Sequence, residues 1–256
     1  MPTTRQNGSL YTKIENRIAT LEFGHPASNS FPSELLERLT KEINAISDND
    51  EVSVVVLKSE GSKAFCAGAS FDELIAIKNL TEGKQFFTGF ANVINAMRRC
   101  SKLIMGRVQG KAVGGGVGLI AACDYAIATD KAAIKLSEFT IGIGPFVIAP
   151  VVKRKMGISG LAELTLDATS WKNAYWAKQK GLYAKVLESE KDLDYEIEVL
   201  AEKLASYNLD ALSEMKKTLW EGTDHWDVLL KERAAISGKL VLSEFTKKAL
   251  EKFQKQ

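Results

Sequence analysis

Short β-type runs dominate the N-terminal part of the chain, and helical periodicity lies between them. Residues 11–15 and 17–23 alternate apolar and polar side chains around a short polar turn, which predicts two paired strands. After Ser33 the apolar residues return at helical spacing. Residues 52–60 form a β-branched run bounded by charge, which is typical of a buried strand.

The same order of elements recurs further along the chain. We predict a loop at 61–70 and helices at 71–78 and 82–100. A strand at 102–113, a turn that enters a helix at 114–124, and strands at 125–129 and 132–138 follow. Strands that alternate with helices need crossover connections. The pattern therefore predicts an α/β fold.

The pattern changes near residue 192. The windows 192–208, 209–222 and 242–256 are amphipathic helices with no strand between them. We therefore predict an α/β core at 1–191 and a helical region at 192–256 that serves packing or oligomerisation.

Composition narrows the function classes. Of 256 residues, 45% are hydrophobic and 26% charged, as in ordinary globular proteins. The net charge of +2 gives no electrostatic reason to expect nucleic acid or an anionic membrane. No apolar run is long enough for a membrane span or an export signal, so we predict a cytoplasmic protein. The three cysteines are far apart in apolar contexts, which favours buried free thiols over disulfides or metal ligands.

Two turns carry the candidate chemistry. Ser70 is followed three residues later by Glu73, a spacing that predicts a capping box, so Ala69 lies at a helix entrance where N–H groups are unpaired. The second turn holds Gly114, Gly115 and Gly116, which permit positive φ and a close ligand approach before a helix.

Other sites that use glycine-rich turns or catalytic triads do not fit. The second turn lacks the G-x-G-x-x-G spacing and lies far from the first strand, and no P-loop or G-x-S-x-G sequence occurs. His25 and His225 are the only histidines, which argues against a Ser–His–Asp triad or a His-rich metal site.

Together the two turns resemble the motifs of the enoyl-CoA hydratase/isomerase (crotonase) superfamily. The segment KAFCAGASFDEL is similar to F-[CAS]-A-G-A-D, and GKAVGGGVGLIAACDYAIAT is similar to N-G-x-A-x-G-G-G-x-E-L-A-x-x-C-D. The resemblance implies a ββα superhelix whose C-terminal helices build trimers or pairs of trimers. It also implies that the N–H groups of Ala69 and Gly115 form an oxyanion hole for a coenzyme A thioester.

The resemblance assigns acid–base chemistry to two carboxylates, of which this chain keeps one. Gly118 stands where the motif G-G-G-x-E has its glutamate, whereas Glu138 matches the second glutamate twenty residues on. A carboxylate in an apolar pocket has a raised pKa, which suits proton transfer near neutrality.

Further residues follow from the same resemblance. Ala67, Ala69 and Phe71, with Gly114 and Gly115, are expected to bind the acyl-CoA. The last predicted helix carries Lys247, Lys248 and Lys252, which are candidates for binding the CoA phosphates. Of these, Lys248 is taken as the candidate site residue. Asp124 is expected to be structural. The segment around Trp171, Tyr175 and Trp176 is expected to wall the acyl pocket, with the aromatic rings there packing. No metal and no separate cofactor are expected, since coenzyme A is part of the substrate.

The missing first glutamate leaves several activities open. An isomerase that moves a proton from the α- to the γ-position needs one base, but residues 145–150 replace the hydratase sequence P-G-x-G-G-T in a way that resembles methylglutaconyl-CoA hydratases. We therefore predict hydration of a 2-enoyl-CoA, branched or carboxylated. Isomerisation, decarboxylation and non-catalytic acyl-CoA binding are the alternatives.

Overall fold

Two sheets form the framework of the computed structural model, which describes residues 7–254. The larger has six strands in the spatial order β1 (Ser9–Glu15), β2 (Ile18–Gly24), β3 (Val54–Ser59), β5 (Leu103–Val108), β7 (Tyr125–Thr129) and β10 (Lys185–Leu187). The smaller has the order β4 (Ala64–Cys66), β6 (Lys111–Val113), β8 (Ala133–Lys135) and β9 (Lys172–Asn173). Among the strand pairs of residues 7–254, β1–β2 and β8–β9 are antiparallel and the others are parallel. The predicted α/β class is confirmed.

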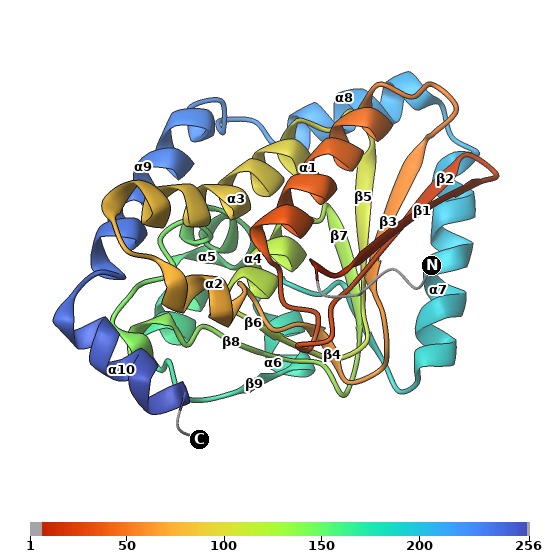
Figure 1. The fold of residues 1–256 in the computed structure, drawn as a ribbon. Helices are drawn as coiled ribbons and strands as arrows, with labels where there is room; N and C mark the ends of the chain where they lie inside the picture. The colour runs from red at the N-terminus through yellow and green to blue at the C-terminus, as the bar shows by residue number, and fades with distance from the viewer. Residues whose placement is uncertain (1–6, 255–256) are drawn as a thin grey trace, which may run out of the picture.

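A strand–strand–helix unit repeats along the chain and places one strand in each sheet. The helices are α2 (Phe71–Ala76) and α3 (Leu80–Arg99) after β3–β4, α4 (Gly115–Ala122) after β5–β6, and the 3₁₀ turn η2 (Glu138–Ile141) with α5 (Ala149–Leu166) after β7–β8. The short strands β4, β6 and β8 cross the lower end of the larger sheet (Figure 1). Because these three strands are parallel, their carboxyl ends meet at one edge.

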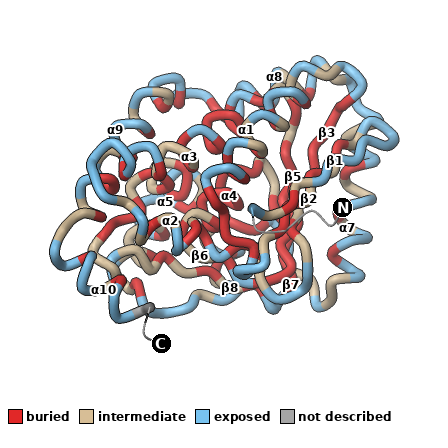
Figure 2. The backbone as a smooth tube through the Cα atoms, viewed as in Figure 1, coloured by how far each residue is buried: buried red, intermediate tan, exposed pale blue. Residues whose placement is uncertain are grey.

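Alternating side chains of the larger sheet supply two cores. In β3, Val55 and Leu57 join the main core beneath α1 (Ser33–Ser47), α3 and α4. Val54 and Val56 face the other way and pack with Leu193 of α7 (Glu190–Ala205). Both faces of the central strands are therefore buried, which explains the continuous apolar run in the sequence. Figure 2 shows this burial along β3, β5 and β7.

Two sequence-based predictions need correction, and two helices were missed. The predicted loop at 61–70 contains β4, and the single strand predicted at 102–113 is two strands, β5 and β6, in different sheets. The helices α5 and α9 (Trp226–Leu240) were not predicted. Gly157 interrupts the helical backbone of α5 with φ of 72°, which breaks the periodicity that a sequence pattern relies on.

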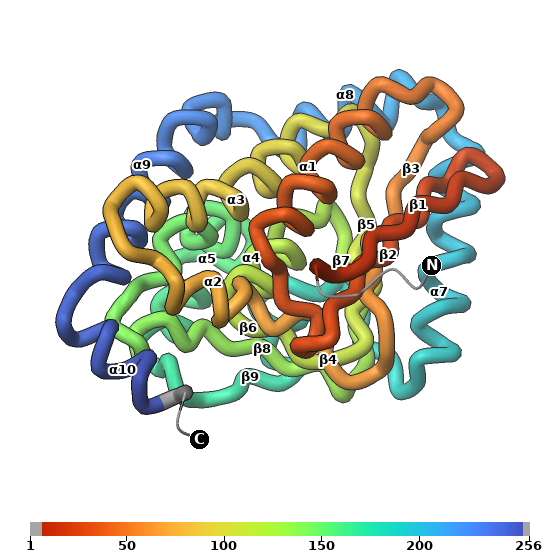
Figure 3. The backbone as a smooth tube through the Cα atoms, in the orientation of Figure 1, coloured from red at the N-terminus to blue at the C-terminus, as the bar shows by residue number. Residues whose placement is uncertain are grey.

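The predicted C-terminal helices are present as α7, α8 (Leu209–Leu219) and α10 (Glu244–Gln254). α9 runs beside α3, although the two are far apart in sequence (Figure 3). Their backbones meet at Gly83 and Gly238, where a Cβ atom on Gly238 would lie 2.5 Å from the Lys84 nitrogen. The boundary between 191 and 192 and an oligomerising role for 192–256 stay predictions. Among the described helices, none has the length and apolar character of a membrane span.

The cysteines behave as the sequence suggested. Cys66, Cys100 and Cys123 are all buried and free. Burial raises the pKa of the Cys66 and Cys123 thiols to about 12. These thiols therefore stay protonated and act as small apolar groups.

Asp124 is the centre of a buried polar cluster that joins the larger sheet to α8. Its carboxylate accepts a hydrogen bond from the Ile104 N–H at 2.7 Å. It also pairs with Lys216 at 2.6 Å, where both side chains are 3% exposed. Trp220 Nε1 donates to the other carboxylate oxygen at 2.7 Å. These contacts give Asp124 the structural role expected from the sequence.

Replacing Asp124 with asparagine should strongly destabilise the protein. The change leaves the Lys216 ammonium buried without a counter-charge, which costs about 3–5 kcal/mol of unfolding free energy. Urea unfolding at pH 7 measures it. The control is Glu214→Gln on α8, the helix that carries Lys216, because the Glu214 carboxylate is 71% exposed in its pair with Lys217. Equal, small effects of the two variants would contradict the role of the buried pair.

Candidate active site

A cavity of about 590 Å³ lies at the edge of the smaller sheet where β4, β6 and β8 end. Its walls come from the segments that follow these strands, from α2 and α3, from the entry to α5 and from α9. Ala67, Ala69, Phe71, Gly114, Gly115 and Glu138 all line this cavity. Of the predicted catalytic and CoA-binding residues, all but Lys248 line this cavity.

The first turn is held in place by the loop before α1. The Phe31 N–H donates to Gly68 O at 2.8 Å, and the Ser70 N–H donates to Phe31 O at 2.9 Å, so Phe31 and Ala69 form a parallel bridge. In such a bridge the N–H of Ala69 points away from Phe31. That N–H has no acceptor among the described residues.

The cap of α2 differs in part from the predicted capping box. The Ser70 hydroxyl accepts from the Glu73 N–H, as predicted. The Glu73 carboxylate does not return to Ser70, whose N–H is used by Phe31, and instead accepts from the Ser33 N–H at 3.0 Å. Glu73 thereby ties the first turn to the start of α1.

The second turn approaches the first closely. Gly114 has φ of 54° and its N–H donates to Lys135 O at 3.0 Å, which fixes the turn to β8. Gly115 is the first residue of α4, so its N–H has no partner within the helix, and none occurs elsewhere among the described residues. A Cβ atom on Gly68 would lie 3.6 Å from the Gly115 nitrogen. Two unpaired N–H donors therefore lie on adjacent turns that line one cavity.

Glu138 is the single carboxylate among the residues that line the cavity. A Cβ atom on Gly114 would lie 2.9 Å from Glu138 Oε1, so the carboxylate lies beside the second turn. The residue as a whole is partly exposed, but Oε2 is shielded from solvent and has no hydrogen-bond partner among the described residues. Burial raises the pKa of Glu138 to about 7, although a hydrogen bond from its own backbone N–H opposes the shift.

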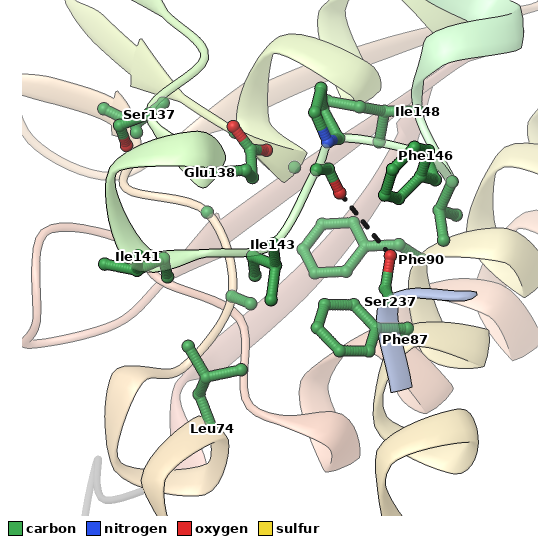
Figure 4. Close-up of a pocket in the computed structure, with 18 of the residues that line it drawn as sticks. Leu74, Phe87, Phe90, Ser137, Glu138, Ile141, Ile143, Phe146, Ile148 and Ser237 are labelled. Atoms are coloured by element: carbon green, nitrogen blue, oxygen red, sulfur yellow. Dashed lines mark hydrogen bonds between the residues drawn. The ribbon is translucent and has the colours of Figure 1, made fainter. Parts of the chain in front are cut away.

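The remaining walls are mainly apolar. Phe87 and Phe90 of α3, with Phe146, lie across the cavity from Glu138, and Ile143 lines it nearer to Glu138 (Figure 4). Ser237 of α9 also lines the cavity, and its hydroxyl lies 3.5 Å from Gly144 O. A carboxylate with a pKa near neutrality thus faces an apolar space and two free backbone donors, an arrangement that can move protons on a bound carbonyl compound.

A comparison with protein-family models decides the family. Residues 13–253 match the model described as enoyl-CoA hydratase/isomerase. The chain belongs to the enoyl-CoA hydratase/isomerase family. Members of this family are enzymes that act on acyl-CoA thioesters.

The curated relatives include proteins named as hydratases and proteins named as isomerases. The chain is 31% identical over 176 residues to the short-chain-enoyl-CoA hydratase of Clostridium acetobutylicum. The aligned region covers 68% of this chain and 67% of that protein. It is 25% identical over 228 residues to a peroxisomal Delta(3,5)-Delta(2,4)-dienoyl-CoA isomerase of Arabidopsis thaliana, with 83% and 78% covered. The chain spans about half, 52%, of a putative enoyl-CoA hydratase/isomerase, YngF, of Bacillus subtilis.

Solved structures agree on the fold. The enoyl-CoA hydratase of Bacillus halodurans superposes with a TM-score of 0.88 at 20% identity, over 95% of this chain and 99% of that chain. The enoyl-CoA hydratase/isomerase family member described here therefore has the crotonase-type α/β fold, with helices at its C-terminal end.

The position of the missing family glutamate has no free space. A Cβ atom on Gly118 would lie 2.4 Å from Ile148 Cγ2 and 2.8 Å from Ile148 Cβ. Ile148 is 3% exposed and lines the cavity, whereas Gly118 does not. The sequence showed that a glycine replaces the glutamate, but only the structure shows which side chain fills the space.

Lys248 and the predicted aromatic residues Trp171, Tyr175 and Trp176 are not among the residues that line the cavity. Lys248 is an exposed residue of α10 and is not among the lining residues. Neither Trp171 nor Trp176 lines the cavity, where Ala168 and Thr169 of the preceding segment are found instead. Trp176 Nε1 donates to Glu163 at 2.8 Å, which is a packing role. The role of Lys248 at the CoA phosphates stays a prediction.

Sequence reasoning missed the part of the site that comes from distant segments. Phe86, Phe87 and Phe90 gave only a helical apolar pattern, and Ser237 lay in an unpredicted helix. No signal in the sequence distinguishes a phenylalanine that lines a cavity from one that fills a core. Among residues 7–254, no cluster of three or more metal-ligating side chains occurs.

Glu138 should make stability depend on pH. Its folded pKa of about 7 lies above the ordinary value of 4.5, so the unfolded chain loses this proton first as the pH rises. Stability therefore falls between pH 4.5 and about 7 and then levels off. Glu138→Gln removes this loss, so the variant should gain in thermal midpoint relative to the parent protein as the pH is raised from 4.5 to 8. A difference that stays constant with pH would contradict the raised pKa.

Proposed function

We propose that this protein isomerises 3-enoyl-CoA thioesters to 2-enoyl-CoA thioesters, with Glu138 as the single acid–base group. The observation that carries the proposal is the lone carboxylate of the cavity, which lies beside two unpaired backbone N–H groups. Moving a proton from one carbon to another requires one group that accepts and then returns it. A group with a pKa of about 7 does both near neutrality.

The proposed reaction has two proton transfers. The thioester carbonyl oxygen accepts hydrogen bonds from the N–H groups of Ala69 and Gly115. The Glu138 carboxylate removes a proton from the α-carbon, and the electron pair of that C–H bond moves into an enolate that the two donors stabilise. The protonated Glu138 then gives the proton to the γ-carbon while the double bond shifts into conjugation with the carbonyl.

Hydration of a 2-enoyl-CoA is the second candidate. The name of the Clostridium acetobutylicum relative favours it, as does the resemblance of residues 145–150 to a hydratase subgroup. Glu138 would then both activate water and protonate the α-carbon. Isomerisation fits the cavity better, because its lining holds one carboxylate and no second one that could activate water.

The acyl group is proposed to be uncharged. Lys135 is the single cation among the residues that line the cavity, and its ammonium lies 4.7 Å from the centre of the Trp171 ring. The walls formed by Phe87, Phe90 and Phe146 would bury a carboxylate without a partner, which is costly. A methylglutaconyl group therefore fits less well than a plain alkenyl chain.

The rest of the assignment also remains proposed. Coenzyme A enters as part of the substrate, and no separate cofactor is needed for the two proton transfers above. Ala67 and Phe71 would contact the CoA portion beside Ala69. The protein would assemble as a trimer or a pair of trimers in the cytoplasm, and Lys248 would then reach the CoA phosphates of its own or a neighbouring subunit.

Glu138→Gln should reduce isomerisation about 10²-fold or more, because amide nitrogen cannot take up the α-proton. The assay follows the appearance of the conjugated enoyl thioester absorbance from a 3-enoyl-CoA. For the parent protein, kcat/KM should rise with pH through about 7 as Glu138 ionises.

The matched control is Glu244→Gln, since this carboxylate is 81% exposed on α10 and pairs at the surface with Lys247. Its turnover should equal that of the parent protein. If Glu138→Gln turned over 3-enoyl-CoA as fast as the parent protein, Glu138 would not be the acid–base group. Hydration of a 2-enoyl-CoA without isomerisation would favour the second candidate.

A further inference from the structure

Gly118 and Ile148 form a complementary pair in which one residue fills the space that the other leaves. Gly118 lies in the interior of α4, and Ile148 is the residue that precedes α5. The 2.4 Å separation between a Cβ at 118 and Ile148 Cγ2 is far shorter than any real contact. No side chain fits at 118 while Ile148 keeps its place.

The two departures from the family pattern are reciprocal. The motif G-G-G-x-E has a side chain at the position of Gly118, and the hydratase sequence P-G-x-G-G-T has a glycine at the position of Ile148. In this chain the larger side chain is at position 148 and the glycine is at position 118. A close-packed interior tolerates such an exchange when both positions change together, because the total volume is kept.

The exchange also changes the chemistry of one wall. Ile148 lines the cavity in place of residue 118 and lies across the cavity from Glu138, next to Phe146 (Figure 4). This wall therefore offers hydrocarbon where a carboxylate at 118 would offer a hydrogen-bond acceptor for water. Such an acceptor would activate water for addition to the enoyl group while Glu138 protonates the α-carbon.

We propose that Ile148 is a specificity-determining residue that restricts this site to proton transfer and excludes hydration, by filling the space of a second acid–base group. The proposal rests on the proposed function for the wild-type reaction. It predicts that the chain becomes a hydratase when the bulk is moved back, in the double variant Gly118→Glu with Ile148→Gly.

The gained reaction balances with the groups named. The carboxylate at 118 takes a proton from water, and the water oxygen bonds to the β-carbon of the 2-enoyl thioester. The electron pair of the C=C bond moves to the thioester carbonyl as an enolate held by Ala69 and Gly115. Protonated Glu138 then gives its proton to the α-carbon, which yields the 3-hydroxyacyl thioester.

The test compares hydration of a trans-2-enoyl-CoA by the double variant and by its isosteric control, Gly118→Gln with Ile148→Gly. Both variants have the same space and nearly the same side-chain volume, but only the first has a second carboxylate. We expect the Glu/Gly variant to hydrate at least 10-fold faster than the Gln/Gly control, as one acid–base group contributes 10-fold or more. Equal rates in the two folded variants would overturn the proposal.

A stability cycle keeps the inference testable if the glutamate variants do not fold. Gly118→Ala should lower the thermal midpoint, because its Cβ collides with Ile148, and adding Ile148→Gly should make the alanine harmless. Strictly additive midpoint changes would contradict the complementary packing and overturn the proposal.

Wild-type turnover separates this inference from the proposed function. If the parent protein does not isomerise a 3-enoyl-CoA, the proposed function fails, while the Glu-versus-Gln comparison still measures whether a carboxylate at 118 gives hydration once the Ile148 side chain is removed. If the parent protein isomerises and the comparison shows no gain, the inference fails alone.

Discussion

Close approach of two backbone turns is the constraint on which the site depends. The turn at Gly68 and the turn at Gly114 meet because β4 and β6 are parallel neighbours, and their carboxyl ends open at the same edge. Phe31 then fixes the first turn and Lys135 O the second, each through backbone hydrogen bonds. Those bonds orient the N–H groups of Ala69 and Gly115 without consuming them. Under the proposed function, turns fixed in this way let the two N–H groups stabilise a developing charge without reorganisation.

The electrostatics of the cavity follow from what surrounds Glu138. Its carboxylate has apolar neighbours on the facing wall and no ion pair within the described chain, so burial dominates its pKa. Asp124 shows the opposite arrangement, since Lys216 and Trp220 match both of its oxygens. One carboxylate is thus held ready to exchange a proton near neutrality, and the other holds the sheet to α8.

The C-terminal helices shape the cavity as well as the exterior. α9 can lie against α3 because Gly83 and Gly238 let the two backbones meet, and this contact brings Ser237 to the cavity wall. α10 packs on η2, the short turn that begins with Glu138. The position of Glu138 therefore depends on a helix that follows it by about a hundred residues, which local patterns do not reveal.

The sequence by itself determined the α/β class, most of the strands and helices, and the two turns with Glu138, because these rest on local spacing, glycine content and motif resemblance. It did not separate β5 from β6, since both lie in one strand-like run and only tertiary packing assigns them to different sheets. The apolar wall of Phe87, Phe90 and Ile148 was likewise decided by tertiary structure. In the sequence, Gly118 shows only that a glutamate is absent. The structure shows that Ile148 occupies the space beside it. Because the two residues are thirty positions apart, no pattern along the chain predicts this contact.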